Sequence, residues 1–449
     1  MPRSVSKKKR VRRAWIITLI VWIAVFSIWV LSPLNPFLLL VSLITGLAIS
    51  RYLLSSTRKG AVAVLNYHSV SHNPAWLRIG EQLSIHPRQF ERQLRYLKQN
   101  NYETLTIPEL YDYLSHRSVA NKSQKKIVLT FDDGYADNFV TAFPLLKKYD
   151  MKATIFVSTD FILKDAQGAR HNSEEGYLRE SHIKQMVKSG LVDIQSHGVT
   201  HTRVFNDDKS LGFHHGQLEN IWLFWNNRPR HKTEWWQHDL TSFALHGYPL
   251  HKQGPALTDR KFCVNEQVIN HLHTFAAQRS PNKHKERNSD VACRQELQNF
   301  LASASLPYGS FETHEEYDER IRGELEKSRE QIEKLTNKPV AFLCWPQNEY
   351  SQKSLNLAAQ CGYKATVSNF FSSSNCITNS ASTIGRVYVG APCFGTHNPY
   401  AQLLGFHATI KCFEGSYVWY PVVALSNALN KLFFKQTEPD PFMSIQDQL

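Results

Sequence analysis

Short apolar runs and amphipathic stretches alternate along the middle of the chain. Residues 126–129 form an apolar run typical of a buried strand, and apolar side chains then repeat at helical spacing between Tyr135 and Lys148. A second short strand begins at Val192. This alternation is typical of an α/β sheet or barrel. Further helices are predicted over Gln89–Lys98, Ile107–Leu114 and Phe311–Leu335, the last a cover helix with Ile321, Leu325 and Ile332 on one stripe.

The N-terminus carries the longest apolar stretch. Residues 14–31 are 18 residues without a charge, close to the roughly 20 that span a bilayer. After a proline-containing break, a second apolar stretch runs from Phe37 to Ser50. No cleavage site of a secretory signal is evident. We therefore expect residues 14–54 to be a membrane anchor of one or two transmembrane helices.

The side of the membrane on which the rest of the chain lies depends on whether one or both of the apolar stretches cross the bilayer. If both do, they form a hairpin with basic residues at each end, and the positive-inside rule places the rest of the chain in the cytoplasm. If only one does, the rest lies outside. We favour the hairpin, and the seven scattered cysteines, which lack any Cys-x-x-Cys pair, agree with a reducing compartment.

The positive charge is concentrated at the N-terminus. Residues 1–13, the expected cytoplasmic tail, hold seven basic residues and no acidic one, more than half of the net charge of +13. The remaining excess is spread over the other 436 residues. This distribution excludes a nucleic-acid binder, which needs a basic patch on its folded domain.

Two consecutive carboxylates follow the first predicted strand. The sequence Thr130-Phe131-Asp132-Asp133-Gly134 places them at the strand's C-terminal end, where α/β folds present their functional groups. Because adjacent side chains point in different directions, one can serve a metal ion and the other a proton. An Asp-Gly pair alone usually marks only a turn, so this interpretation depends on neighbouring signals.

Two histidines four residues apart supply such a signal. His197 and His201 follow the strand that begins at Val192. Imidazoles at this spacing converge on one side of a turn and suit a divalent ion, although the pair is weak evidence in a chain with 20 histidines. With Asp133 they make three protein ligands and leave room for water, as in catalytic metal sites.

These residues resemble the polysaccharide deacetylases, carbohydrate esterase family four. The sequence from Thr130 to Gly134 matches the family's first motif completely. His197 and His201 match its second motif, His-Ser/Thr-x-x-His, with the serine displaced to the front. Lys148–Ser158 is similar to the family's next strand, and Asn337–Tyr350, followed by a Gly-Tyr-Lys-Ala sequence, is similar to its third motif.

The resemblance covers about residues 61 to 205 and 315 to 390. It implies an α/β fold, a distorted (β/α)7-type barrel of the polysaccharide deacetylase kind, with a catalytic domain formed by residues 61–204 and 311–395.

The resemblance also implies roles for individual residues. Asp132 is the general base, while Asp133, His197 and His201 hold one divalent metal ion. The family's usual Leu-x-His acid near the C-terminus is not evident. His68, in the sequence Asn-Tyr-His-Ser, looks like the acid of a circularly permuted branch of the family. The alternative for His68 is a strand-end histidine that only contacts a backbone carbonyl.

The third motif departs from the family pattern. The family has an arginine and an aromatic residue around a proline, whereas this chain has a cysteine followed by Trp345, Pro346 and Gln347. Gln347 would offer its backbone N–H to the oxyanion, a role that does not depend on its side chain. Arg386 resembles a late arginine of the permuted branch and is the candidate to keep Asp132 ionised. Stacking on a sugar ring would come from Trp345 or from elsewhere.

Residues 205–310 form a large insertion that begins directly after the second histidine, so we expect it to overhang the site. Nine histidines and a group of tryptophans argue against full disorder. A lid or substrate-selecting subdomain is favoured over a second metal site. The tryptophans of the insertion are Trp222, Trp225, Trp235 and Trp236.

Residues 396–449 are a C-terminal extension. Its stretch from Tyr417 to Lys435 either lies on the membrane surface or packs on the core.

The expected function is metal-dependent removal of N-acetyl or related acyl groups from an amino sugar, in a polysaccharide or a lipid-linked saccharide. Zn²⁺ is the expected ion, with Co²⁺, Ni²⁺ and Mn²⁺ as alternatives. The partners are the carbohydrate or glycolipid and the lipid bilayer. The hairpin interpretation predicts the inner (cytoplasmic) membrane with the barrel in the cytoplasm; the alternative is the periplasmic or cell-surface face.

A catalytically inactive, membrane-anchored carbohydrate-binding protein on the same fold is the rival interpretation. The altered third motif supports it. A complete metal set beside Asp132 argues against it, because a binding protein needs no general base next to a metal ion. No Gly-x-Ser-x-Gly sequence is present, which argues against a serine esterase.

Overall fold

The predicted tail and most of the predicted membrane anchor lie outside the described residues. Among the helices that are described, none is both long and apolar enough to cross a bilayer. The computed structural model describes scattered positions between 20 and 46 and residues 62–77, 83–115, 125–165, 173–278, 286–369, 382–390, 392–414 and 416–433.

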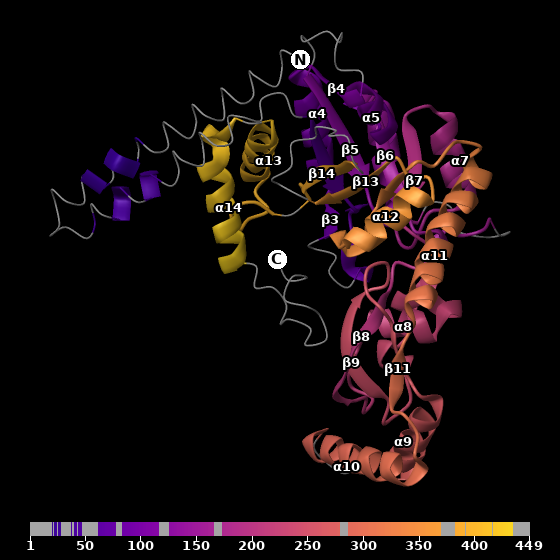
Figure 1. Ribbon diagram of the computed structural model, residues 1–449. Helices are drawn as coiled ribbons and strands as arrows, with labels where there is room; N and C mark the ends of the chain where they lie inside the picture. The colour runs from indigo at the N-terminus through magenta and orange to yellow at the C-terminus, as the bar shows by residue number, and fades with distance from the viewer. Residues whose placement is uncertain are drawn as a thin grey trace.

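Seven parallel strands close into a barrel within the described part of the chain (Figure 1). β1 (Ala63–Tyr67) pairs with both β5 (Lys125–Phe131) and β14 (Ser382–Tyr388), which completes the ring, and the order around the ring follows the order along the chain. An additional strand, β4 (Tyr102–Leu105), pairs with the first half of β5. The predicted seven-stranded α/β barrel is confirmed. Its strands are β1 (Ala63–Tyr67), β5 (Lys125–Phe131), β6 (Ala153–Val157), β7 (Val192–Ser196), β12 (Phe342–Cys344), β13 (Ala365–Asn369) and β14 (Ser382–Tyr388).

Helices cover the outside of the barrel, and the predicted ones begin and end within a few residues of their expected positions. The stretch predicted as a single helix after Tyr135 differs, because it starts as a π-helical turn, η3 (Asn138–Ala142), before continuing as α6. The covering helices are α4 (Pro87–Gln99), α5 (Ile107–Ser115), α6 (Phe143–Tyr149), α7 (Glu180–Lys188), α11 (His314–Thr336) and α12 (Gln352–Gln360). Short connecting elements are β2 (Ser69–Val70), η2 (Pro74–Trp76), β3 (Ser84–Ile85), η4 (Thr159–Phe161) and η7 (Pro346–Asn348).

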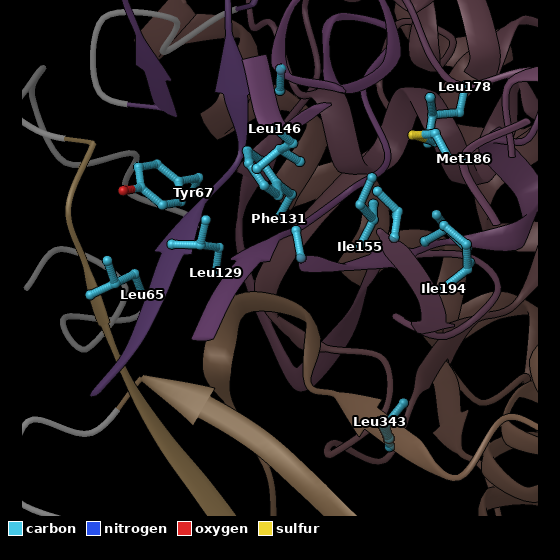
Figure 2. Packing of buried hydrophobic residues seen from close by; sticks show 14 of the residues in the cluster. Leu65, Tyr67, Leu129, Phe131, Leu146, Ile155, Leu178, Met186, Ile194 and Leu343 are labelled. Carbon is cyan, nitrogen blue, oxygen red and sulfur yellow. The ribbon is translucent and has the colours of Figure 1, made fainter. Parts of the chain in front are cut away.

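Successive residues of each strand point to opposite sides of the barrel wall. Leu65 and Leu129 belong to the cluster that packs against the helices, and Figure 2 shows them beside one another. Val64, Val128 and Ile384 belong to a separate buried cluster, which fills the inside of the barrel together with residues of α5. The inside of the barrel is therefore filled with packed apolar side chains at the level of Val64, Val128 and Ile384.

The same inward register becomes polar toward the C-terminal ends of the strands. Thr130 and Asp132 follow Val128 at intervals of two, and Arg386 follows Ile384 in the same way. All three side chains are buried, and the Thr130 hydroxyl donates a hydrogen bond of 2.8 Å to the carbonyl of Leu65. The alternation along each strand thus brings a carboxylate and a guanidinium to one mouth of the barrel.

The predicted insertion is a folded lobe below the barrel (Figure 1). The antiparallel pair of β8 (Arg203–Phe213) and β9 (Pro249–Pro255) and the α-helices described in this region were not apparent from the sequence, because apolar positions here follow no clear period. Its inner part packs Phe224 and Trp235 against Trp76, Tyr135 and Phe161 of the barrel side. The elements are β8 (Arg203–Phe213), α8 (Ile221–Asn227), η5 (Pro229–Gln237), η6 (Leu240–Phe243), β9 (Pro249–Pro255), β10 (Phe262–Val264), α9 (Glu266–Gln278), α10 (Glu286–Ala304) and β11 (Gly309–Phe311).

The C-terminal extension forms α13 (Pro399–Phe413), a turn η8 (Tyr417–Trp419) and α14 (Tyr420–Phe433), which lie beside the barrel, at the left in Figure 1. α13 packs on the barrel through Phe406 and Ile410. α14 packs on α13 but leaves Leu425, Leu432 and Phe433 exposed. The two interpretations given for Tyr417–Lys435 therefore both stay open for α14, whereas α13, which precedes that stretch, packs on the barrel.

A buried carboxylate next to this mouth of the barrel makes stability dependent on pH. Asp137 accepts hydrogen bonds from the Ser69 hydroxyl (2.6 Å) and the Asn138 amide (2.9 Å), yet burial raises its pKa to about 7. The folded pKa therefore lies above the unfolded value of about 3.9. The resulting stabilisation is complete below about pH 4 and is lost as the pH rises through about 7.

Replacing Asp137 by Asn is expected to remove this dependence, because the amide stays neutral. Between pH 5 and pH 8 the free energy of unfolding of the wild type should fall by about 3 kcal/mol more than that of the variant, at about 1.4 kcal/mol for each pKa unit. Denaturant unfolding curves at the two pH values check this. An equal decrease in the free energy of unfolding of both proteins would show that Asp137 is not the group responsible for the pH dependence.

Candidate active site

Asp132 and Asp133 leave β5 on a tight turn. Asp133 has φ 68° and Gly134 has φ 69°, so two successive residues adopt the left-handed conformation. A side chain at Gly134 would meet Val157 Cγ1 at 2.9 Å, which requires glycine there. A left-handed conformation is costly for a non-glycine residue and persists where the surroundings fix it. Here it turns the two consecutive carboxylates toward different neighbours.

Asp133, His197 and His201 form one cluster. The two Nε2 atoms lie 3.4 Å (His197) and 3.2 Å (His201) from the same oxygen, Oδ1 of Asp133. That buried oxygen accepts no hydrogen bond from any residue that the structure describes. The three predicted ligands are thus brought together, with atoms that all lie within 4.8 Å of one another.

The two imidazoles of the cluster differ in acidity. Burial lowers the pKa of His201 to about 4, so this ring is neutral, as a metal ligand must be. Burial also opposes the charge on His197, but Cys344 and Asp133 outweigh it and raise the pKa of this ring. A cation bound by the cluster would displace that proton and balance the charge of Asp133 in its place.

The loop that carries His201 is held by α11. Oε2 of Glu324 accepts hydrogen bonds from the backbone N–H groups of Val199 (3.1 Å) and Thr200 (3.2 Å), and Oε1 accepts one from the Thr200 hydroxyl. Nδ1 of His197 lies 2.8 Å from the carbonyl of Cys344, which leaves its Nε2 directed at Asp133. Such outer contacts fix the orientation of metal-binding imidazoles.

Asp132 faces a different partner. Its two oxygens receive hydrogen bonds of 2.7 and 2.5 Å from the two terminal nitrogens of Arg386, and both side chains are buried. Burial alone would raise the pKa of Asp132, but the guanidinium outweighs it, and the pKa lies below the usual value. Asp132 is therefore ionised and able to accept a proton. The arginine absent from the third motif is supplied by β14.

His68 lies on the other side of Asp132. Its Nε2 is 3.8 Å from Oδ2 of Asp132, and its ring meets the ring of Tyr388 edge-on at 5.7 Å. Its buried Nδ1 makes no hydrogen bond to a described residue. Burial lowers the pKa of His68, more than the charge of Asp132 raises it, so the protonated ring would be a strong proton donor. The backbone-bonded alternative for His68 finds no support in these contacts.

Cys344 lies beside the carboxylates and is part of a second buried group of possible metal ligands. Asp132, His197 and Cys344 also lie close enough together to hold an ion. The Arg386 guanidinium, however, is 3.0 Å from the Cys344 sulfur and pairs with Asp132. Because this charge repels a cation, the cluster around Asp133 is the one that fits a metal.

The third-motif residues lie close to the histidine loop, but Trp345 does not reach the surface. A Cβ atom added at Gly198 would lie 3.8 Å from the Pro346 ring, and Gln347 has φ 52°, an unusual conformation that turns the backbone here. Trp345 is 0% exposed, so of the two sources of sugar stacking left open by the sequence, Trp345 or another residue, this conformation excludes Trp345. The reason is its position directly after β12, where its ring joins the barrel's outer core.

An aromatic ring of the insertion lies close to the histidine cluster. Trp222, at the start of α8, lies with its ring centre 5.9 Å from that of His201 and inclined by 29° to it, and it is only half-buried. Lys232 of η5 reaches the same loop, where its amino group contacts the carbonyl of Thr200 (2.5 Å) and the carboxylate of Asp160 (3.1 Å). The predicted position of the insertion over the site agrees with these contacts.

Sequence reasoning missed Glu324 and Lys232. Glu324 is one of many glutamates on a solvated helix, and Lys232 lies in a stretch without periodicity. The tryptophan cluster was visible in the sequence, but nothing indicated which of its members approaches His201.

Comparison with known proteins gives consistent matches over the barrel. The sequence profile of the polysaccharide deacetylase family matches residues 119–219 and 270–366. The matched segments include Asp132, Asp133 and both histidines. His68 and Arg386 lie outside them, and so do residues 220–269 of the insertion.

Two curated relatives illustrate the similarity. The chain is 34% identical over 148 residues to YxkH of Bacillus subtilis, named as an inferred polysaccharide deacetylase, covering 33% of this chain and 46% of that protein. It is 28% identical over 114 residues to the poly-β-1,6-N-acetyl-D-glucosamine N-deacetylase of Staphylococcus aureus, covering 25% and 37%. The chain thus spans less than half the length of either relative.

Solved structures with a similar arrangement include a de-N-acetylase from Aggregatibacter actinomycetemcomitans and IcaB from Ammonifex degensii. The first has a TM-score of 0.45 at 17% identity and covers 73% of this chain and 94% of its own. The second has a TM-score of 0.44 at 16% identity and covers 80% and 98%.

Proposed function

We propose that this chain, in which residues 119–219 and 270–366 match the polysaccharide deacetylase family, is a metal-dependent hydrolase that removes N-acetyl groups from an amino sugar. The observation that carries the proposal is the division between the two consecutive carboxylates. Asp133 faces two imidazoles, whereas Asp132 faces Arg386 and His68. The arrangement around Asp133 suits the binding of a cation, and the arrangement around Asp132 suits proton transfer.

The residues present fit a divalent metal ion. Asp133, His197 and His201 would hold it, and Zn²⁺ suits a set of two imidazoles and one carboxylate, as do Co²⁺, Ni²⁺ and Mn²⁺. Such an ion lowers the pKa of water and polarises an acyl carbonyl. The buried Oδ1 of Asp133, which has no hydrogen bond from a described residue, supports its presence in the working protein.

The chain's own groups divide the remaining work. Asp132, kept ionised by Arg386, accepts the proton of the attacking water as its oxygen adds to the acyl carbon. The backbone N–H of Gln347 donates to the developing oxyanion. Protonated His68 gives its proton to the departing nitrogen, because an amine is a poor leaving group as an anion.

Acetate release from N-acetylglucosamine oligomers by the purified chain tests this function. We expect release that stops on chelation of metal and returns on addition of Zn²⁺. If the protein binds the oligomers but releases no acetate with Zn²⁺, Co²⁺, Ni²⁺ or Mn²⁺, the proposal is contradicted and the carbohydrate-binding protein is favoured.

Trp222 is the surface on which we expect a sugar ring to stack near His201. Trp222→Ala should raise KM about fivefold with little change in kcat, because an aromatic contact of this kind contributes about 1 kcal/mol. Trp222→Phe, which keeps a ring, should restore most of the loss. Steady-state kinetics on the oligomers check this, and an unchanged KM in Trp222→Ala would place the sugar elsewhere.

The N-terminal apolar stretches support attachment to a membrane, and the exposed apolar side chains of α14 agree with a membrane surface nearby. A saccharide carried on a lipid stays at that surface, so tethering raises its effective concentration. This favours a lipid-linked substrate for a cytoplasmic barrel, and a polymer for an external one.

A reporter fused after Leu449 that is active only in the cytoplasm, or only outside, distinguishes the two orientations. The hairpin predicts a signal from the cytoplasmic reporter. A signal solely from the outside reporter would contradict the lipid-linked substrate and leave a periplasmic or cell-surface polysaccharide deacetylase.

A further inference from the structure

A second group of two imidazoles and one carboxylate lies in the insertion. His231, Glu234 and His238 belong to the segment formed by η5 and the residue after it, and their ligand atoms all lie within 4.8 Å of one another. Nδ1 of His231 is 3.6 Å and Nε2 of His238 is 3.7 Å from the same oxygen, Oε1 of Glu234. The donor set is the same as in the cluster around Asp133.

The distances fit a bound ion better than hydrogen bonds. Bonds of about 2.0–2.1 Å at tetrahedral angles place neighbouring ligand atoms about 3.4 Å apart. Separations of 3.6 and 3.7 Å approach that value, as do the 3.4 and 3.2 Å found around Asp133. The separations of 3.6 and 3.7 Å from Glu234 are too long for a nitrogen–oxygen hydrogen bond.

Regular helical spacing does not account for this convergence. Glu234 has φ −136° and ψ 25°, which are not helical values, so the segment bends at the carboxylate. The bend brings His238, seven residues after His231, to a ring-centre distance of 4.4 Å from it. The chain thus departs from a regular helix at the residue that joins the two histidines.

The orientation of His238 adds an independent observation. Its ring stacks on Phe224 of α8 at a centroid distance of 5.9 Å, and its Nε2 is buried without a hydrogen-bond partner among the described residues. A buried polar atom without a partner is uncommon in folded proteins, and a bound ion is one of the partners that would satisfy it. The atom lies on the side of the ring that faces Glu234.

We propose that His231, Glu234 and His238 bind a second divalent transition metal ion, with Zn²⁺ the best fit to the donor set. The family sequence profile does not match this segment, so the site belongs to the insertion of this chain. It is separate from the barrel cluster and does not depend on the proposed deacetylase function.

The position of the site indicates a structural role. Lys232 follows the first ligand and contacts Thr200 in the loop of His201, while the indole N–H of Trp235, which follows the second ligand, donates to the Tyr177 hydroxyl at 3.1 Å. An ion at this bend would hold the segment that carries both contacts. Its removal should therefore loosen the packing of the insertion against the barrel.

Metal counting on the full-length protein tests the proposal. Protein loaded with Zn²⁺ and freed of excess ion should hold two equivalents, and Asp133→Ala should hold one. Adding His231→Gln and His238→Gln to Asp133→Ala should remove the last equivalent, whereas adding His246→Gln, an exposed histidine of the insertion outside the cluster, should not. Far-UV circular dichroism verifies that each variant is folded.

Thermal unfolding provides a second readout that requires no enzymatic activity. In the Asp133→Ala background, Zn²⁺ should raise the midpoint of unfolding, and the double histidine substitution should abolish the rise. An unchanged zinc count and an unchanged rise after that substitution would overturn the proposal. So would an Asp133→Ala protein that holds no zinc.

Discussion

Asp132→Asn should lower turnover by about 10²- to 10⁴-fold while leaving the metal content of the barrel unchanged, because the lost function is proton transfer. The carboxylate of Asp132 contacts Arg386, His68 and Cys344, and the three expected metal ligands are other residues. Rates of acetate release and metal content per folded chain are the two measurements. A variant with near-normal turnover would show that another group is the base.

A complication of this substitution is the buried charge that it leaves on Arg386. An uncompensated buried charge costs about 3–5 kcal/mol, so some loss of stability is expected in Asp132→Asn. The double substitution Asp132→Asn with Arg386→Gln removes both charges. It should recover much of the stability and none of the turnover, which separates catalysis from folding.

Arg386→Gln alone should be the most destabilising single change near the site. It leaves the Asp132 carboxylate buried without its two charge-assisted hydrogen bonds, so the free energy of unfolding should fall by about 3–5 kcal/mol. The pKa of Asp132 should rise, since the largest of the charges that oppose the effect of burial is then removed. The lower limb of the pH–rate profile should accordingly move to higher pH.

Arg386→Lys is the matched control, since it keeps the charge but not the bidentate geometry. We expect intermediate stability and a smaller shift of the pH–rate profile. Chemical denaturation and kinetics between pH 5 and 8 supply both values. An Arg386→Gln protein as stable as the wild type, with an unmoved profile, would contradict the role given to this ion pair.

Much of the barrel could be predicted because its signals are local. The apolar run before Asp132 and the amphipathic pattern of α11 both arise from burial on one side of an element. Motif residues at strand ends were placed correctly for the same reason, since the C-terminal ends of parallel strands share one mouth.

Contacts between distant residues could not be predicted from local patterns. Arg386 lies 254 residues from Asp132, and because only the closure of the barrel by β14 brings them together, the pair could be expected only from the family resemblance. The burial of Trp345 follows from packing, which its residue type does not reveal. The helices of the insertion were missed because small satellite cores impose no regular period on their segments.

The central claim is that two consecutive carboxylates do different work, and zinc titration of two variants tests it most directly. In a background of His231→Gln and His238→Gln, only ions bound in the barrel are counted. Asp132→Asn should bind one Zn²⁺ equivalent with an affinity close to that of the background protein, and Asp133→Asn should bind none at the same concentrations. Loss of zinc from both variants, or from Asp132→Asn alone, would contradict the account.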